Sequence, residues 1–431
     1  MMLHKPKRHG LLAVSPLFVM GLLLLGFGMM WGGASRVPLL VVFVLTAVWA
    51  VASLRGFTLD ERMRCFSRGA GHASLLLMVW IFVLAGAFAA SARAMGAVDA
   101  MVSLTLAVMP SHMLLGGMFV AACLVSLSMG TSVGTIVALP PVAVGMAERM
   151  EMSVPVMAAA TVGGAFFGDN LSFISDTTVV ATQTQGCEMR DKFRVNFAIV
   201  FPAALLTFVV YAVMGSSAPD TETPAAAISD LPKVIPYVAV LLLALAGTNV
   251  LLALLVGTLL SGVVGMLYGS FDMQTWLSAA AEGAGGMGEL IVISMLAGGV
   301  MEIVRVNGGV TYTVWLLTRR IRGQRGAELS IASLVSLTNL CTANNTVAIL
   351  SVGEISKGIA RRYNVEPKRA ASILDTFSCF VQSMIPYGPQ LLIAGGLASI
   401  NPAEIAASMV YPYFMAGSAV FAIMIKRRHY S

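Results

Sequence analysis

Charged residues are scarce in this sequence. Asp, Glu, Lys and Arg make up 11% of its 431 residues, whereas a soluble domain carries about 25%. Hydrophobic residues make up 58%, and apolar runs near the ~20 residues needed to cross a bilayer recur from Leu11 to Ile425. The connections between these runs are too short for a soluble domain of useful size. We therefore expect an all-α polytopic membrane protein whose whole chain is one membrane domain.

Patterns that hold metals or disulfides are also lacking. The cysteines show no CxxC spacing and no histidine partners, and several lie inside apolar runs. We therefore expect no disulfide framework, no metal cofactor and no other cofactor. The five cysteines are Cys65, Cys123, Cys187, Cys341 and Cys379.

The net charge of +6 does not indicate a nucleic-acid partner, because most basic residues lie in short blocks between apolar runs. Such blocks mark cytoplasmic loops, so both chain termini are expected in the cytoplasm. The pattern, without a sorting signal, favours a multi-pass protein of a bacterial inner (cell) membrane, with the lipid bilayer as its partner. The blocks are residues 5–8, 55–68, 190–194, 319–325, 357–369 and 426–428.

The chain matches itself at an offset of 212 residues, which becomes 211 farther along. Arg93 falls on Arg305, for example, and further matches follow in the same order. The order and the nearly constant offset indicate a duplication. The two copies are residues 1–215 and residues 216–431.

Equivalent loops of the two copies differ in charge. Residues 55–72 are basic, but the equivalent residues 270–286 contain neither Lys nor Arg. The turn at residues 110–112 is uncharged, whereas its equivalent carries the arginines of residues 319–325. By the positive-inside rule, equivalent loops lie on opposite sides of the membrane. The repeats are therefore inverted, a common plan of secondary transporters.

Each copy is predicted to hold about five transmembrane helices, one re-entrant hairpin and one broken helix. Residues 113–147 are interrupted at residues 130–135, and the second leg is short for a crossing. This favours a hairpin, although two short crossings preserve the sidedness. The second copy repeats the plan, with a hairpin tip at residues 342–346 and a break at residues 382–389. The first-copy segments are residues 11–31, 37–54, 73–95, 113–147, 155–186 and 196–214.

One polar stretch lies deep in an apolar segment, at residues 163–182. It reads GGAFFGDNLSFISDTTVVAT and carries Asp169 and Asp176, although a carboxylate in hydrocarbon costs about 3 kcal/mol. We expect the three glycines before these acids to break the helix and to free carbonyl groups for an ion. In the second copy, the prolines and glycine of IPYGP, residues 385–389, break the helix instead.

The oxygen atoms at both breaks suit a monovalent cation. A hard cation prefers carboxylate, hydroxyl and carbonyl oxygens, and buried neighbouring carboxyl groups also hold protons readily. Such a cation and H+ then compete for Asp169 and Asp176, and a site that cannot reorient empty couples their exchange. The candidate ion-site residues are Asp169, Asn170, Ser172, Ser175, Asp176, Thr177 and Thr178 at the first break, Thr131, Ser132 and Thr135 at the first hairpin tip, Asn344, Asn345 and Thr346 at the second tip, and Ser383 at the second break.

Local structure offers another interpretation of the same residues. An Asp at a break can cap a half-helix by accepting backbone N–H bonds, which applies to Asp176 and also to Asp169. The Thr and Asn side chains of the hairpin tips can satisfy their own turns. Asp375 and Glu354 are further candidates, for a proton route.

The motif GDNLSFISDTT, preceded by SVGT at residues 132–135 and answered by IPYGP, resembles the NhaC family of sodium/proton antiporters. The resemblance covers most of the chain. The chain is also similar to the wider ion-transporter group with inverted repeats and hairpins. Phe173 stands where the family often has proline, and Tyr387 where it often has tryptophan. The resemblance implies a cation-coupled antiporter that carries Na+ and H+. Because the family includes exchangers of organic acids and amino acids, the resemblance implies the transported substrate less firmly than it implies cation-coupled antiport.

We expect a secondary active transporter, a sodium/proton antiporter that works by alternating access. The alternative is sodium- or proton-coupled exchange of a small organic acid or amino acid. An intramembrane aspartyl protease needs two acids from separate helices, but here both lie in one segment, so an enzyme is not favoured. A passive channel fits two inverted, broken halves less well. A homodimer is an open alternative to a monomer.

Overall fold

The structure is a computed structural model, and it describes residues 10–32, 37–108, 110–173, 175–215, 228–318 and 321–425. Within these ranges the chain forms helices and their connections only, which confirms the all-α prediction. Among the described residues, five helical spans are long and apolar enough to cross a membrane: Gly10–Met30, Leu75–Met95, Met189–Gly215, Val250–Leu267 and Met273–Val306. The chain is thus a polytopic membrane protein. The terminal basic blocks at residues 5–8 and 426–428, and Arg319 and Arg320, lie outside the described residues.

The helices of the first half follow the predicted apolar segments with a few differences. They are α1 (Gly10–Met30), α2 (Leu39–Ser53), α3 (Leu59–Ala70), α4 (Ala73–Met95), α5 (Ala97–Val108), α6 (Leu114–Met129), α7 (Ser132–Ala138), α8 (Pro140–Arg149), α9 (Val154–Leu171), α10 (Asp176–Gln185) and α11 (Met189–Gly215).

The described part of the second half is also helical. Its helices are α12 (Ile235–Leu245), α13 (Val250–Leu267), α14 (Met273–Gly286), α15 (Gly288–Val306), α16 (Gly309–Thr318), α17 (Gly323–Thr342), α18 (Asn345–Arg362), α19 (Pro367–Gln382), α20 (Pro389–Ala398), α21 (Pro402–Ser408) and α22 (Tyr411–Ile425).

Two expectations about helix bounds are wrong. The basic segment at residues 55–72, expected as a loop, contains α3. A capping box starts this helix: the Thr58 hydroxyl accepts from the Glu61 N–H at 3.3 Å, and the Thr58 N–H donates to the Glu61 carboxylate at 2.8 Å. The last helix of the first half, expected from residue 196, begins at Met189. Its first two turns carry charged residues, a pattern that predicts a loop between apolar segments.

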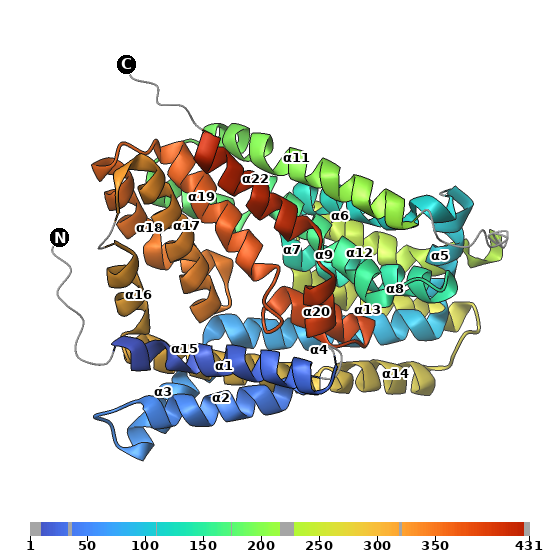
Figure 1. Cartoon of the computed structure of the whole chain (residues 1–431). Helices are drawn as coiled ribbons and strands as arrows, with labels where there is room; N and C mark the ends of the chain where they lie inside the picture. The colour runs from blue at the N-terminus through green and yellow to red at the C-terminus, as the bar shows by residue number, and fades with distance from the viewer. Residues whose placement is uncertain are drawn as a thin grey trace.

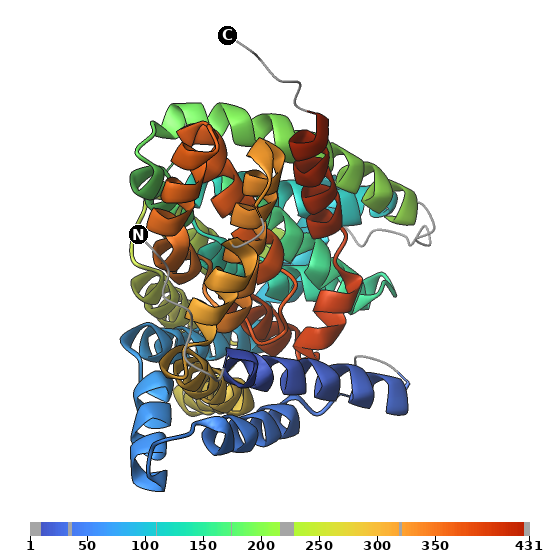
Figure 2. The ribbon, with the colours of Figure 1, turned by 60° about the vertical axis from the view of Figure 1, so that its left-hand side comes forward.

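The helices form two groups that Figures 1 and 2 place on opposite sides of the molecule. The first group joins α1–α4 to α13–α15, and its largest contacts are those of α4 with α14 and α13, and of α15 with α3 and α2. The second group joins α6–α11 to α17–α22. Each group therefore takes helices from both halves of the chain.

The contacts between the halves occur in pairs. α4 packs on α13 and α14, and α15 packs on α2 and α3; in the other group, α10 packs on α18, and α20 packs on α7. Glycine pairs mark two of these crossings. A Cβ on either Gly86 or Gly283 would lie 2.9 Å from the other's carbonyl carbon, and one on Gly69 would lie 3.0 Å from that of Gly298. Backbones meet directly at both crossings, as small residues allow in membrane helices.

The predicted interruptions of the two hairpin segments are present. Gly130, whose φ of +69° is left-handed, caps the end of α6, and α7 starts after Thr131. Ala343, with a φ of +49°, caps the end of α17, and α18 starts after Asn344. α17 and α18 pack against each other along the hairpin. The chain therefore turns sharply at both places where polar residues interrupt an apolar segment.

Candidate ion-binding site

The first broken helix consists of α9 and α10, with the break between Leu171 and Asp176. The expectation that the glycines break the helix is wrong, because Gly163, Gly164 and Gly168 all lie inside α9. Gly164 and Gly168 admit α6: a Cβ on Gly168 would lie 2.5 Å from the Ser126 carbonyl carbon, whereas Gly163 faces Tyr411 of α22. The Ser126 hydroxyl also donates to the Ala165 carbonyl at 2.5 Å. Gly164 and Gly168 thus set the spacing of α6 and α9.

The second broken helix consists of α19 and α20, and the break lies between Gln382 and Pro389 as predicted. Pro386 and Pro389 lack a backbone N–H, so two helical hydrogen bonds cannot form at this break. The Tyr387 hydroxyl donates to the Leu340 carbonyl at 2.8 Å, which ties this break to α17.

Asp169 lies in the last turn of α9 and is only 5% exposed. Both of its carboxylate oxygens accept hydrogen bonds from hydroxyl groups. Ser175, in the break, donates at 2.6 Å, and Ser132, at the start of α7, donates at 2.9 Å. The Ser175 hydroxyl is 2.9 Å from that of Thr177. The first hairpin tip and the first break therefore meet at one buried carboxylate.

Two glutamines extend this cluster to the second half of the chain. Gln390, at the start of α20, donates to the Ser132 hydroxyl at 3.3 Å. Gln382, at the end of α19, donates to the Gln390 side-chain carbonyl at 2.9 Å and to the Ala343 carbonyl at 3.0 Å. A chain of hydrogen bonds thus runs from Asp169 through both breaks to the second hairpin tip. Neither glutamine was predicted as a site residue.

A second buried cluster surrounds Lys192 of α11, whose side chain is 0% exposed. Its ammonium group donates to the Asn170 carbonyl at 2.6 Å and to the Thr178 hydroxyl at 2.7 Å, and it forms an ion pair with Asp375 of α19. The Asn196 amide donates to the Asn170 side-chain oxygen at 2.8 Å and to Asp375 at 3.3 Å. This cluster joins α9, α10, α11 and α19.

Lys192 is not among the predicted site residues, because it stands in the basic block at residues 190–194, which is expected to be cytoplasmic. The helical period distinguishes Lys192 from the other basic residues of this block. Lys192, Asn196 and Val200 recur every four residues and are buried, whereas Arg190 and Arg194 are exposed. Lys192 therefore lies on the inward face of α11.

The remaining candidates at the first break and tip differ in position. Asn170, Thr177 and Thr178 belong to the two clusters, and Ser172 is buried beside them. Thr135 is buried and donates to the Thr131 carbonyl at 3.3 Å. Asp176 is exposed at the first position of α10. The structure thus brings one of the two predicted carboxylates into the buried cluster.

The candidates of the second half bond mainly to their own turns. Asn344 accepts from the Val347 N–H at 3.0 Å, and Asn345 accepts from the Thr346 N–H at 3.1 Å. Ser383 donates to the Phe380 carbonyl at 2.8 Å. These bonds are the ones expected if the side chains serve local structure. Of the two further acids, Asp375 lies in the Lys192 cluster, and Glu354 is exposed.

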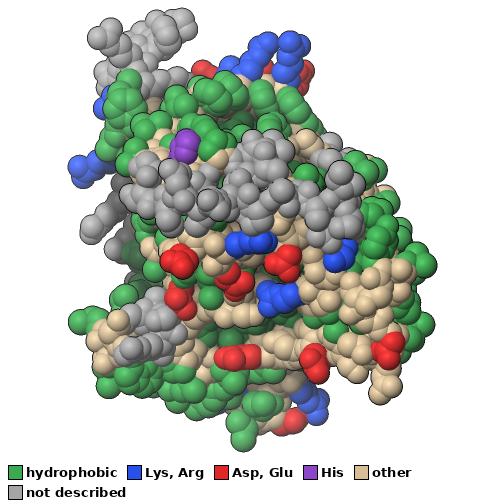
Figure 3. All heavy atoms as spheres, turned by 90° about the vertical axis from the view of Figure 1, so that its right-hand side faces the viewer, with side chains coloured by type: hydrophobic (Ala, Val, Ile, Leu, Met, Phe, Trp, Pro, Cys, Tyr) green, Lys and Arg blue, Asp and Glu red, His purple; other side chains and the backbone are tan. Residues whose placement is uncertain are grey.

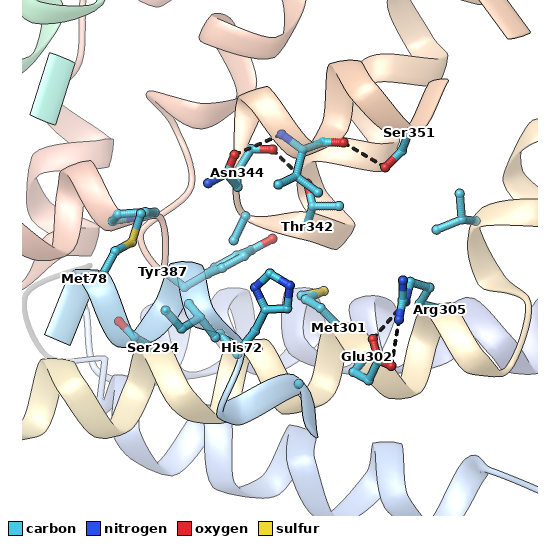
Figure 4. A pocket seen from close by; sticks show the side chains of 18 of the residues that line it. His72, Met78, Ser294, Met301, Glu302, Arg305, Thr342, Asn344, Ser351 and Tyr387 are labelled. Atoms are coloured by element: carbon cyan, nitrogen blue, oxygen red, sulfur yellow. Dashed lines mark hydrogen bonds and ion pairs between the residues drawn. The ribbon is translucent and has the colours of Figure 1, made fainter. Parts of the chain in front are cut away.

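A cavity of about 390 Å³ lies next to the second hairpin tip. Figure 4 shows Thr342 and Asn344 on one side, His72 and the Glu302–Arg305 ion pair on the other, and Tyr387 between them. Ala343 also lines this cavity, and its carbonyl accepts the hydrogen bond from Gln382. The hydrogen-bonded chain that starts at Asp169 therefore ends at the cavity wall.

Comparison with known proteins shows the family of this chain. A family model described as the Na+/H+ antiporter family matches residues 11–216 and 225–426. The chain belongs to this family. The matched segments contain both broken helices and both hairpin tips, and the resemblance to the NhaC family is confirmed.

Several curated relatives are similar over most of this antiporter-family chain. The Na+/H+ antiporter NhaC of Bacillus subtilis (strain 168) is 25% identical, over 82% of this chain and 84% of its own. The malate-2H+/Na+-lactate antiporter of the same organism is 20% identical, over 84% of each chain. The Na+/H+ antiporter NhaC of Alkalihalophilus pseudofirmus is 23% identical, over 62% of this chain and 64% of its own. These relatives are transporters, so the family places this multi-pass membrane protein among transporters, not enzymes.

Proposed function

We propose that this protein exchanges Na+ for H+ and that the two ions compete for Asp169. The observation that carries the proposal is a buried carboxylate at a helix break, bonded through both oxygens to the hydroxyl groups of Ser132 and Ser175. A hydroxyl group can turn its hydrogen away and offer a lone pair. The same three side chains then present oxygen ligands to Na+, as a hard cation requires.

Competition follows from the charge of this site. An ionised Asp169 without a cation leaves a charge inside the membrane, which costs about 3 kcal/mol or more. Either Na+ or H+ removes that charge. A transporter that reorients readily only when Asp169 is neutral therefore carries Na+ in one direction and H+ in the other. Asp176, exposed at the start of α10, lies on the proposed route of the ion to this site.

We propose that the halves, residues 1–215 and 216–431, are inverted repeats that alternate access to this site. Two contacts support this proposal: α4 packs on α14, and α15 packs on α3. If α4 is equivalent to α15 and α3 to α14, a pseudo-twofold axis between inverted repeats turns one of these contacts into the other. The two hairpins, α6 with α7 and α17 with α18, are proposed to be re-entrant, so that their tips lie near the membrane centre.

The orientation in the membrane follows from charge. α3 and the end of α18, both of which carry basic residues, lie toward the left of Figure 1, whereas Figure 3 shows acidic side chains mixed with basic ones on the opposite end. By the positive-inside rule, the left end is the proposed cytoplasmic side. The cavity contains Gly69 and His72, which directly follow a basic block, so it is the proposed cytoplasmic entrance.

The test is proton flux in proteoliposomes, recorded with a trapped pH dye while Na+, Li+ or K+ is added outside. We expect Na+-driven proton flux in the wild type and its loss in Asp169→Asn. Asp60→Asn is the matched control, because Asp60 is exposed on α3 and pairs with Arg64, and it should behave as the wild type. Full Na+-driven flux in Asp169→Asn would remove this carboxylate from the mechanism.

A second candidate function is exchange of a small organic acid, as in the malate-2H+/Na+-lactate relative. The cavity favours it, because about 390 Å³ accommodates a small dicarboxylate and Arg305 and His72 lie on its wall. Uptake of labelled malate or lactate by the same proteoliposomes, lost in Arg305→Gln, is the result that this alternative predicts. Absence of uptake alongside Na+-driven proton flux would eliminate it.

A further inference from the structure

Lys192 carries a charged side chain in the interior of a membrane protein, where such side chains are rare. Its side chain and that of Asp375 are both 0% exposed, and a buried ammonium group is stable only when it is paired and fully hydrogen-bonded. Its three N–H donors find three acceptors: the Asn170 carbonyl at 2.6 Å, the Thr178 hydroxyl at 2.7 Å, and the Asp375 carboxylate. No donor capacity is left over.

The acceptors around Lys192 have the chemistry of a Na+ site. They are one carbonyl, one hydroxyl and one carboxylate oxygen, the oxygen types that a hard monovalent cation prefers. The Asn170 carbonyl belongs to the last turn of α9, where backbone carbonyls lack helical partners and carry the negative end of the helix dipole. This position favours a cation, both the ammonium group of the Lys192 side chain and a free ion such as Na+.

Charge counting shows what the lysine does to the site. Asp169 and Asp375 contribute two negative charges, and Lys192 contributes one positive charge, so the two neighbouring clusters carry one net negative charge. One Na+ or one H+ neutralises that charge. Without Lys192, two cations would be needed.

We infer that the Lys192 ammonium is the resident cation of a second cation subsite, formed by Asp375, Thr178 and the Asn170 carbonyl, and that it limits the protein to one transported Na+. This inference rests on the proposed function, because it takes Asp169 as the first site. It differs from a purely structural ion pair, which would not alter the number of ions bound.

The experiment is equilibrium binding of radioactive Na+ to purified protein, with the number of ions bound per chain at saturation as the readout. The wild type should bind one Na+, and Lys192→Gln should bind two, because the vacated subsite accepts Na+. Lys192→Arg keeps the charge and should bind one. Lys368→Gln, a surface lysine near Glu366, is the matched control and should also bind one.

Double variants separate the two subsites. Lys192→Gln with Asp169→Asn should still bind one Na+, now at Asp375, whereas Asp169→Asn alone should bind none. Lys192→Gln with Asp375→Asn removes both charges of the pair and should return to one. This last variant removes both members of the Lys192–Asp375 pair, so neither is left buried without the other, and it tests the inference even if Lys192→Gln does not fold.

Two results would overturn the inference. One is a single bound Na+, or none, in a folded Lys192→Gln protein; the other is zero or two bound Na+ in the Lys192→Gln, Asp375→Asn protein. A wild type that binds no Na+ would instead contradict the proposed function. Thermal unfolding supplies a second readout: Na+, compared with choline, should raise the melting temperature of Lys192→Gln with Asp169→Asn, but not that of Asp169→Asn.

Discussion

A methyl group added at Gly168 would force α6 away from α9 beside the ion site. The new Cβ would lie 2.5 Å from the carbonyl carbon of Ser126, whereas carbon atoms in contact settle at about 3.5–4.0 Å. The two helices must therefore separate locally by about 1 Å. Because the obstacle is backbone and not the end of a flexible side chain, no rotamer change relieves the clash.

The cost of Gly168→Ala has two parts. Overpacking of this kind costs about 1–3 kcal/mol, and separation also weakens the 2.5 Å hydrogen bond from Ser126 to Ala165, which contributes about 1 kcal/mol. We expect the free energy of unfolding to fall by about 2–4 kcal/mol. Asp169 follows Gly168 directly, so its 2.9 Å bond from Ser132 should lengthen and Na+ affinity should fall as well.

Thermal unfolding in detergent and Na+ binding measure the two effects. Gly417→Ala is the matched control: nothing lies within 4 Å of its Cβ position on α22, and alanine favours a helix over glycine by about 1 kcal/mol. That control should be as stable as the wild type or more so. If Gly168→Ala keeps both the wild-type melting temperature and the wild-type Na+ affinity, then the close contact does not position the site.

Two more predictions concern ion pairs and caps away from the site. Arg369 of α19 donates to the Glu328 carboxylate of α17 at 2.7 and 3.0 Å in a buried pair, so Arg369→Met alone should lower the free energy of unfolding by about 3–5 kcal/mol. The double variant with Glu328→Leu should recover part of that loss in the same thermal assay, and an equal or larger loss would contradict the account. At the start of α3, hydrogen bonds from the Thr58 backbone and hydroxyl lower the pKa of Glu61 below its ordinary value of 4.5. Because the folded-state pKa is lowered, the ionised Glu61 cap stabilises α3 at pH values above the ordinary pKa. This stabilisation is lost as the pH falls through the folded-state pKa of Glu61. The rate of amide hydrogen exchange in α3 of the wild type should rise at acid pH relative to the intrinsic exchange rate at the same pH. This relative rise should be absent in Glu61→Gln.

The helix breaks could be predicted from the sequence where local chemistry causes them. Pro386 and Pro389 remove backbone N–H donors, and the break between α19 and α20 lies where they stand. The prediction that Gly164 and Gly168 break the helix is wrong, because glycine in a membrane helix serves close packing as well as bending. Only the position of α6 distinguishes these two uses.

The ion site was predictable in part. Asp169, Ser132 and Ser175 were candidates from residue type, and the structure joins them directly. The Lys192–Asp375 pair bridges residues 183 positions apart and depends on how α11 packs on α19, which no local pattern encodes.

The glutamine links had little signal in the sequence. Gln382 and Gln390 meet only because the second helix breaks between them. The exposure of Asp176 depends in a similar way on the direction in which α10 leaves the first break. Direction after a break is set by tertiary packing, so spacing along a helix gives no guide to it.

The most direct test of the central claim is the dissociation constant of Na+ as a function of pH, measured by equilibrium binding in the wild type and in Asp169→Asn. If one proton and one Na+ compete for Asp169, the apparent dissociation constant should rise about tenfold for each pH unit on the acid side of the transition, and about 1.4 kcal/mol of binding free energy should be lost per unit. Asp169→Asn should show no saturable binding. A dissociation constant that does not change with pH, or an Asp169→Asn protein that binds Na+ as tightly as the wild type, would contradict competition at this carboxylate.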